Sequence, residues 1–240
     1  MDKVDGIILS IANYKNADCV FNILTKEKLI TVLGRGTLNQ NNRTNKLNNP
    51  LICGEFDLYQ GPTNGLKLRD CKVYKHFNEN FKTYEDMMIY DFLVELTFKI
   101  IVNNEDQSGY YDLLYFTLDK YNDFQNKYAL IIYYFAHILI LNGLRIKTDS
   151  CVVCGDKSGF VGIDFIDGGV ICKKDFNEES TPMTSEEIKL YEILFGNSFE
   201  EIKKVSLSKE MFFSFVNNLS IFLVNSLDIK LNSIKLLETI

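Results

Sequence analysis

The sequence CVVCG at residues 151–155, followed by GGVICKKD at residues 168–175, decides the fold of the second half of this chain. Two cysteines separated by two residues on a tight turn direct both sulfur atoms to one point, as a tetrahedral zinc site requires. The second pair, Cys172 and Asp175, begins after 17 intervening residues, a usual spacing for zinc sites built from two such turns. The chain therefore predicts a metal-binding hairpin.

Two strands are expected to connect these pairs. Residues 160–165 and 170–172 are rich in branched and aromatic side chains, and Asp-Gly-Gly at 167–169 is a turn sequence between them. A hairpin of this kind would return the second pair of ligands to the first.

The fourth ligand position carries Asp175, where another cysteine is expected. A carboxylate oxygen can bind zinc, so the sequence predicts one structural zinc ion on Cys151, Cys154, Cys172 and Asp175. The alternative is a relic of such a site, held together by its hairpin and small core without metal. A thioredoxin-like redox pair is disfavoured, because that motif opens a helix in a βαβ unit and none precedes it.

Composition and charge bound the class of protein. The chain has 240 residues, enough for one large or two small domains, and 46% of them are hydrophobic, which excludes wholesale disorder. A net charge of −6 excludes a uniformly basic nucleic-acid-binding protein. Residues 1–77 nevertheless carry 11 Lys and Arg against 7 Asp and Glu, so a polyanion is expected to bind the first third of the chain.

Cysteine usage predicts a reducing, cytoplasmic location. Cys19, Cys53 and Cys71 lie singly in strand-like segments, where a free thiol behaves as a small hydrophobic group. The first residues lead into a strand pattern without a signal peptide. The longest apolar segment, residues 129–141, is too short to span a bilayer, so no contact with membranes is expected.

The first 77 residues predict a small closed barrel of the OB (oligonucleotide/oligosaccharide-binding) type. Short apolar segments separated by polar turns indicate strands at residues 4–14, 19–25, 28–35, 51–60 and 64–76. Residues 61–65 are typical of a turn before the fifth strand. Residues 36–50 contain six Asn, one Gln and one Pro, and predict a loop with room for one helical turn. We expect residues 1–77 to form one domain, in the part of the chain that is expected to bind a polyanion.

After residue 77 the apolar residues recur at helical spacing, so residues 78–240 predict a helical domain. Capping residues and periodicity indicate five helices, which begin near Thr83, Ser108, Asp123, Thr184 and Ser208. The cysteine hairpin, residues 150–176, would be an insertion in this domain. The expected fold class is therefore α+β, with a five-stranded OB barrel followed by a helical domain that carries a zinc-finger-like hairpin.

The sequence offers little support for an enzyme. It contains no G-x-x-x-x-G-K-[ST] phosphate loop and no G-x-G-x-x-G after a strand. Its two histidines, His76 and His137, end a strand and lie in an apolar helix, where a lone histidine is more often structural than catalytic. No histidine lies near the cysteines to complete an open zinc site.

The predicted order of barrel, helical domain and inserted hairpin resembles the RecO family of bacterial DNA repair and recombination mediators. The resemblance covers essentially the whole chain and is carried by residues 5–9, 33–36, 55–59, 141–144, 151–155, 168–172 and 231–235. The run from LNGL at 141–144 into the first cysteine pair is its most specific part. Asp175 departs from the family pattern, which has a cysteine there.

This resemblance implies a protein that is not an enzyme. RecO proteins bind single- and double-stranded DNA and anneal complementary strands. With RecR they promote loading of the recombinase RecA onto strands coated by single-strand-binding protein, whose acidic C-terminal tail they contact. RecF and RecA would be indirect partners. The resemblance also implies a structural zinc ion, which some members lack, and a cytoplasmic, nucleoid-associated location.

The residues themselves agree on a DNA site in the barrel. Residues 28–54 contain no acidic residue. The predicted DNA-binding residues are Lys28, Arg35, Arg43, Lys46, Lys67 and Arg69, with Lys72 and Lys75 as further candidates on the fifth strand. OB barrels bind single strands with basic grooves and stacking aromatic rings. The candidate rings are Tyr14, Phe21, Phe56, Tyr59 and Tyr74, although most aromatic residues of a small barrel belong to its core.

Other functions stay open on the residues alone. An OB-type RNA-binding protein uses the same stacking and phosphate contacts. A protein-docking scaffold needs no nucleic acid, and its basic residues would be an ordinary solvated surface. A thiol or metal enzyme is the least favoured hypothesis, because no catalytic base is placed near the cysteines.

Overall fold

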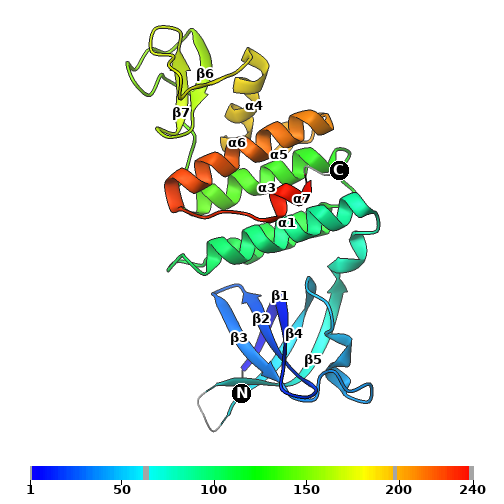
Figure 1. The fold of residues 1–240 in the computed structure, drawn as a ribbon. Helices are drawn as coiled ribbons and strands as arrows, with labels where there is room; N and C mark the ends of the chain where they lie inside the picture. The colour runs from blue at the N-terminus through cyan, green and yellow to red at the C-terminus, as the bar shows by residue number, and fades with distance from the viewer. Residues whose placement is uncertain (1, 62–64, 197–198, 238–240) are drawn as a thin grey trace. The chain divides into compact units, whose positions relative to one another are not determined.

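The computed structural model describes residues 2–61, 65–196 and 199–237 (Figure 1). Contacts between backbone segments divide the chain into two compact units, Met1–Lys120 and Tyr121–Ile240. The first unit joins the barrel to two helices, whereas the sequence places the domain boundary at residue 77. That functional division stays a prediction.

The first unit is built on a closed barrel of five strands, which confirms the predicted fold class. The strands are β1 (Asp2–Tyr14), β2 (Asp18–Thr25), β3 (Leu29–Gly34), β4 (Ile52–Gln60) and β5 (Leu66–His76). Their order around the barrel is β1-β2-β3-β5-β4; β3 pairs with β5 in parallel, and the other neighbours are antiparallel. Each strand lies within two residues of its predicted range, and residues 62–64 of the predicted turn lie outside the described residues.

Alternation of apolar side chains along the strands fills the barrel. Ile8, Phe21, Val32 and Phe56 are all fully buried in its core. Phe21 and Phe56 are therefore excluded from the five candidates for base stacking, because strand alternation turns both rings inward. At Gly54, where the pairing of β4 with β5 shifts register, an added Cβ would lie 2.4 Å from the Lys72 carbonyl oxygen, so only glycine fits.

Two helices complete the first unit. A short 3-10 turn, η2 (Phe77–Asn80), leads into α1 (Tyr84–Ile101), which starts at the predicted capping box, and α2 (Tyr110–Lys120) follows. The α2 helix packs on the barrel: Tyr111 Oη lies 3.7 Å from Cys53 Sγ, and Asp119 forms an ion pair with Lys75. These contacts explain why the barrel and α2 form one compact unit.

The second unit packs helices around a buried central one. Its helices are α3 (Lys127–Leu141), α4 (Ser185–Phe195), α5 (Phe199–Ile202), α6 (Lys209–Leu227) and α7 (Ser233–Leu237). The α3 helix contacts α4, α5 and α6, which accounts for its almost entirely apolar sequence. The short α5 and α7 were not predicted, because four or five residues carry no helical period. Among the described residues, no helix has both the length and the apolar character needed to cross a membrane.

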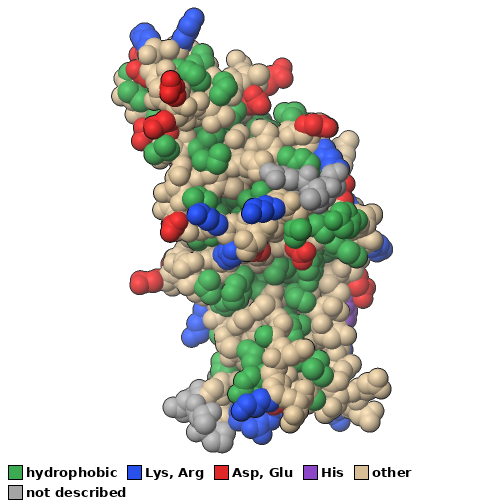
Figure 2. Space-filling model, in the orientation of Figure 1, with side chains coloured by type: hydrophobic (Ala, Val, Ile, Leu, Met, Phe, Trp, Pro, Cys, Tyr) green, Lys and Arg blue, Asp and Glu red, His purple; other side chains and the backbone are tan. Residues whose placement is uncertain are grey.

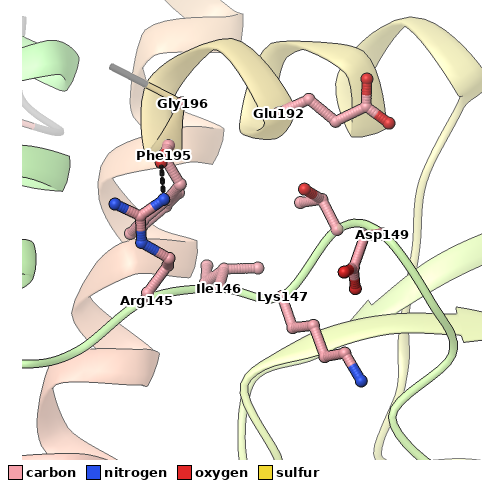
Figure 3. Close-up of a pocket in the computed structure, with 8 residues that line it drawn as sticks. Arg145, Ile146, Lys147, Asp149, Glu192, Phe195 and Gly196 are labelled. Atoms are coloured by element: carbon pink, nitrogen blue, oxygen red, sulfur yellow. Dashed lines mark hydrogen bonds between the residues drawn. The ribbon is translucent and has the colours of Figure 1, made fainter.

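The cysteine hairpin is inserted between α3 and α4. It contains β6 (Phe160–Asp164), β7 (Gly169–Cys172) and the unpredicted two-residue strand β8 (Thr181–Pro182), in the order β7-β6-β8. Arg145 connects the base of the hairpin to the helices by donating from Nη1 to the Phe195 carbonyl at 2.5 Å, and both residues line a cavity of about 290 Å³ at the end of α4 (Figure 3). An arginine in this position also stabilises the negative end of the helix dipole.

The distinction between core and surface rings can be tested by stability. Phe21→Ala should lower the free energy of unfolding by about 3–5 kcal/mol, because it leaves a cavity in the barrel. Tyr74→Ala, on the outer surface, should change it by no more than about 0.5 kcal/mol. Urea denaturation followed by circular dichroism measures both. Equal effects of the two substitutions would contradict the assigned core.

Candidate nucleic-acid interface and metal centre

The four predicted metal ligands lie together at the hairpin. The Sγ atoms of Cys151, Cys154 and Cys172 and a carboxylate oxygen of Asp175 all lie within 4.8 Å of one another. Cys154 Sγ is 3.7 Å from Cys172 Sγ, and Asp175 Oδ2 is 3.1 Å from Cys172 Sγ. Sulfur ligands about 2.3 Å from a tetrahedral zinc ion would be separated by about 3.8 Å, so this spacing fits one ion.

Local backbone geometry produces this convergence. The first turn closes through a hydrogen bond from Gly155 N to the Cys151 carbonyl, and Gly155 adopts a positive φ of 78°. The second turn closes when Asp175 N donates to the Cys172 carbonyl at 3.1 Å. Between the turns, Cys172 N donates to Cys151 Sγ at 3.4 Å. Both pairs are therefore positioned by the backbone.

Hydrogen bonds with Asp175 shift the pKa values of groups in this cluster. Thiols of Cys154, Cys172 and Cys151 donate to Asp175 and lower the pKa of its carboxyl group. The same hydrogen bond with Asp175 raises the pKa of Cys154 to about 12. Burial tends to raise the pKa of Cys151, but backbone N–H groups, first that of Cys154, outweigh burial and lower it. Three sulfurs and one carboxylate oxygen form a donor set that suits a divalent ion.

The connection between β3 and β4 is held by its own asparagines. It contains the predicted helical turn, η1 (Arg43–Lys46). Asn42 Oδ1 accepts hydrogen bonds from N and Oγ1 of Thr44, and its Nδ2 donates to the carbonyls of Arg35 at 3.0 Å and Gly36 at 2.9 Å. The Asn-rich sequence therefore makes an ordered segment, and Asn42 holds the backbone that carries Arg35 beside the start of η1.

Basic residues of the predicted DNA site occupy different environments. Lys28, Arg35 and Arg43 are exposed on turns and on this connection. Lys46 is exposed too, although its Nζ donates to the Cys71 carbonyl at 2.9 Å. Lys67 is only 7% exposed and packs against Gly61. Figure 2 shows basic side chains grouped at one end of the barrel on the face it displays.

Arg69, the last predicted DNA-binding residue, lies on a face of mixed charge. Its guanidinium group is 3.7 Å from Asp57 and 5.3 Å from the centre of the Tyr59 ring. Beside it, Lys3 of β1 pairs with Glu55 of β4 at 2.6 Å. A hollow of about 160 Å³ on this face is lined by Lys3, Glu55, Asp57, Asp70, Cys71 and Lys72. Carboxylates offset the basic charge here, so this mixed-charge face is a poor surface for a polyanion.

Exposed aromatic side chains narrow the candidates for base stacking. Tyr14 is 46% exposed and Tyr74 is 49% exposed, whereas Tyr59 is half-buried. Tyr74 lies on the mixed-charge face, where burial and the nearby Asp5 raise the pKa of its hydroxyl group. Tyr14 ends β1, away from that set of carboxylates in the strand register, and Lys15 Nζ lies 5.7 Å from its ring centre.

A groove between α6 and α7 is a second surface feature, which sequence reasoning did not locate. Its volume is about 620 Å³, and its apolar lining is Ile221, Val224, Leu231 and Ile234. Lys230 and Lys235 also line it, and no acidic side chain is among the described lining residues. The groove thus suits a ligand that is apolar and negatively charged. Helical periodicity could not predict it, because it depends on how α7 returns along α6.

Similarity to known proteins agrees with these features. The family described as "Recombination protein O C terminal" matches residues 82–233. DNA repair protein RecO of Lactobacillus acidophilus is 25% identical over 181 residues, which cover 74% of this chain and 71% of that protein. DNA repair protein RecO of Bacillus cytotoxicus is 23% identical over 214 residues, which cover 87% and 85%. With these matches, the barrel and the inserted hairpin, the chain belongs to the RecO family of DNA repair proteins.

Proposed function

We propose that this protein is a DNA-binding mediator of repair and recombination that acts without catalysing a reaction. The observation that carries the proposal is the acid-free segment between β3 and β4, which presents Arg35 and Arg43 on ordered backbone beside a closed barrel. Guanidinium groups bind phosphates in a fixed geometry, and a preordered segment loses little entropy when it binds.

The proposed phosphate contacts come from Lys28, Arg35, Arg43 and Lys46. Because they neutralise phosphates without reading base edges, they would serve single strands and duplexes of any sequence. Neutralisation of two strands at once also lowers their mutual repulsion, which is the basis we propose for annealing. Lys67 is left out of this set because it is buried, and Arg69 is left out because Asp57 is beside it.

The α6–α7 groove is the proposed site for a protein partner. Its apolar floor and its two lysines complement the acidic, apolar C-terminal tail of a single-strand-binding protein. Family membership further supports RecR as a partner in loading RecA, with RecF and RecA as indirect partners, and a cytoplasmic place on the nucleoid. A mediator needs both surfaces, because it must engage DNA and the protein that coats it.

Zinc is the proposed occupant of the cysteine site. The ligands would be Cys151, Cys154, Cys172 and Asp175, whose spacing fits one tetrahedral ion. When bound, the ion supplies a cross-link between the two turns of the hairpin. Four protein ligands leave no open coordination position, so the role is structural.

The identity of the fourth ligand can be tested with cobalt as a spectroscopic substitute for zinc. Thiolate-to-cobalt charge transfer should report three thiolates in the natural protein, and Asp175→Cys should strengthen that absorption by about a third. Asp175→Ala should weaken metal retention during dialysis against a chelator. Thermal unfolding that is identical with and without zinc would contradict the structural site and favour a metal-free relic.

The phosphate contacts can be tested with a charge-matched pair of variants. Changing Arg35, Arg43 and Lys46 together to Ala should weaken single-strand binding and slow annealing. It should also reduce the log–log salt slope by roughly 0.7 for each phosphate that is no longer neutralised. The matched control changes Lys3, Arg69 and Lys72 to Ala, which removes the same charge from the mixed-charge face.

Fluorescence anisotropy across a salt series measures affinity and slope, and annealing is followed with and without single-strand-binding protein. A control variant that bound as weakly as the test variant would contradict a DNA surface confined to the segment between β3 and β4. Preference for an RNA competitor of equal sequence would favour the RNA-binding alternative, and absence of any binding at low salt would favour a scaffold.

Binding of the tail peptide can be tested by charge reversal in the groove. Lys230→Glu with Lys235→Glu should weaken binding of a synthetic acidic tail peptide about tenfold or more, measured by calorimetry on the full chain. Lys203→Glu with Lys204→Glu is the matched control, because both residues are exposed on the same unit outside the groove. Equal weakening in both double variants would argue for general electrostatic attraction in place of this site.

A further inference from the structure

The turn between β1 and β2 and the start of the β3–β4 connection are tied into one surface. Gly36 N donates to the carboxylate of Asp18 at 2.7 Å, and Leu38 N donates to the Ala17 carbonyl at 3.0 Å. These two bonds, at Gly36 and at Leu38, hold the start of the connection against the β1–β2 turn. Arg35 is therefore held next to the turn between β1 and β2.

Asn42 extends this surface to the second arginine. Its side chain bonds the carbonyls of Arg35 and Gly36, and its own neighbour in sequence is Arg43. Asp18 and Asn42 thus hold the same short backbone segment, Asp18 at the N–H group of Gly36 and Asn42 at the carbonyls of Arg35 and Gly36. Asp18 is also an acid whose oxygen is occupied by a backbone N–H group, so it differs from the ion-paired carboxylates of the mixed-charge face.

Tyr14 lies on the same side of the barrel as this segment. It is the direct partner of Asp18 in the β1–β2 register, and side chains of directly opposed residues in an antiparallel pair point to the same side. Tyr14 is 46% exposed. The ring, Lys15 and the arginine-bearing segment consequently form one aromatic and basic surface, which is the combination that holds single strands.

We propose that this surface is a composite single-strand site, in which Tyr14 stacks on an unpaired base while Arg35 and Arg43 hold phosphates, and Asp18 and Asn42 are positioning residues. The inference rests on the proposed DNA binding and deepens it by naming the residue that would stack on a base and the residues that would position the arginines. Bases in a duplex are already stacked on their neighbours, so the tyrosine contributes only where a base is free.

Substitutions of Asp18 distinguish two roles for its carboxylate, repulsion of phosphate and positioning of Arg35, because the two roles predict opposite changes in DNA binding. If Asp18 only repels phosphate, then Asp18→Ala and Asp18→Asn should strengthen binding equally. If Asp18 positions Arg35, Asp18→Ala should weaken binding of a fluorescent dT20 oligonucleotide and lower the salt slope by roughly 0.7 for each phosphate released. Asp18→Asn keeps an oxygen acceptor for Gly36 N and should bind at least as well as the natural protein.

Asn42 is tested beside a neighbour of the same type. Asn42→Ala should weaken dT20 binding and lower the slope, because it releases the Arg35 and Gly36 carbonyls. Asn41→Ala, at an exposed position in the same segment, should leave both unchanged. Thermal unfolding of each variant distinguishes displacement of the segment that carries Arg35 from unfolding of the barrel. Equal behaviour of the two asparagine variants, with intact folding, would overturn the positioning role of Asn42.

The stacking role is tested by comparing two tyrosines of similar exposure. Tyr14→Ala should weaken dT20 binding by roughly 5- to 150-fold, the range for loss of one base–aromatic stack. It should not change binding of an abasic 20-mer or of a duplex. Tyr14→Phe keeps the ring and should restore binding, and Tyr74→Ala on the mixed-charge face should have no effect.

Equal weakening of dT20 and abasic binding in Tyr14→Ala would overturn stacking, and so would no weakening at all. If Tyr14 and Asp18 variants bind normally while the variant lacking Arg35, Arg43 and Lys46 does not, the composite site fails and the proposed DNA surface stands. If that triple variant also binds normally, the proposed DNA surface fails with it.

Discussion

Closure of the barrel constrains the connection between β3 and β4, and several other features of the structure follow from this constraint. Because β5 lies between β3 and β4 in the closed order, the chain cannot pass from β3 to β4 by a tight hairpin. It has to cross past β5, and residues 35–51 make this crossing. A crossing segment has no strand partner, so its backbone polar groups need other acceptors and donors. Asparagine side chains and the carboxylate of Asp18 supply them.

The same constraint accounts for the segregation of charge on the barrel. Strands β1, β4 and β5 pair side by side, so their outward carboxylates and lysines compensate one another. The crossing segment is acid-free, and its basic residues have no such neighbours in sequence. A chain with a net charge of −6 can therefore still offer a polyanion one favourable surface. In the cysteine hairpin, contacts among Cys151, Cys154, Cys172 and Asp175 connect two turns that pack on only a small core.

Local patterns predicted much of this fold. Two-residue and helical periods located the five strands and the start of α1, and the spacing of Cys151, Cys154, Cys172 and Asp175 located the cluster that could hold a metal ion. Periodicity also indicates which side chains face inward, but it does not determine the burial of every individual residue. Lys67 is buried despite its charge, and Phe21 is in the core although an aromatic residue in an OB barrel can equally stack on a base.

Features that depend on distant segments could not be predicted. Nothing local marks Asp18 as the acceptor for Gly36, 18 residues away, or Asn42 as different from the five other asparagines near it. The α6–α7 groove arises only when the chain after α6 returns along it. These tertiary contacts determine where the sites lie, whereas the sequence determines which residue types are available to build them.

Hydrogen–deuterium exchange of the full chain, with and without a short oligothymidine, tests most directly whether the crossing segment is the DNA surface. Exchange should slow at residues 14–18 and 35–46 when the strand binds, because both segments would be covered and held. Outward positions of β4 and β5 on the mixed-charge face should exchange as before. Slowing confined to β4 and β5, or the absence of slowing in 35–46 at saturating oligonucleotide, would contradict this placement of the DNA surface.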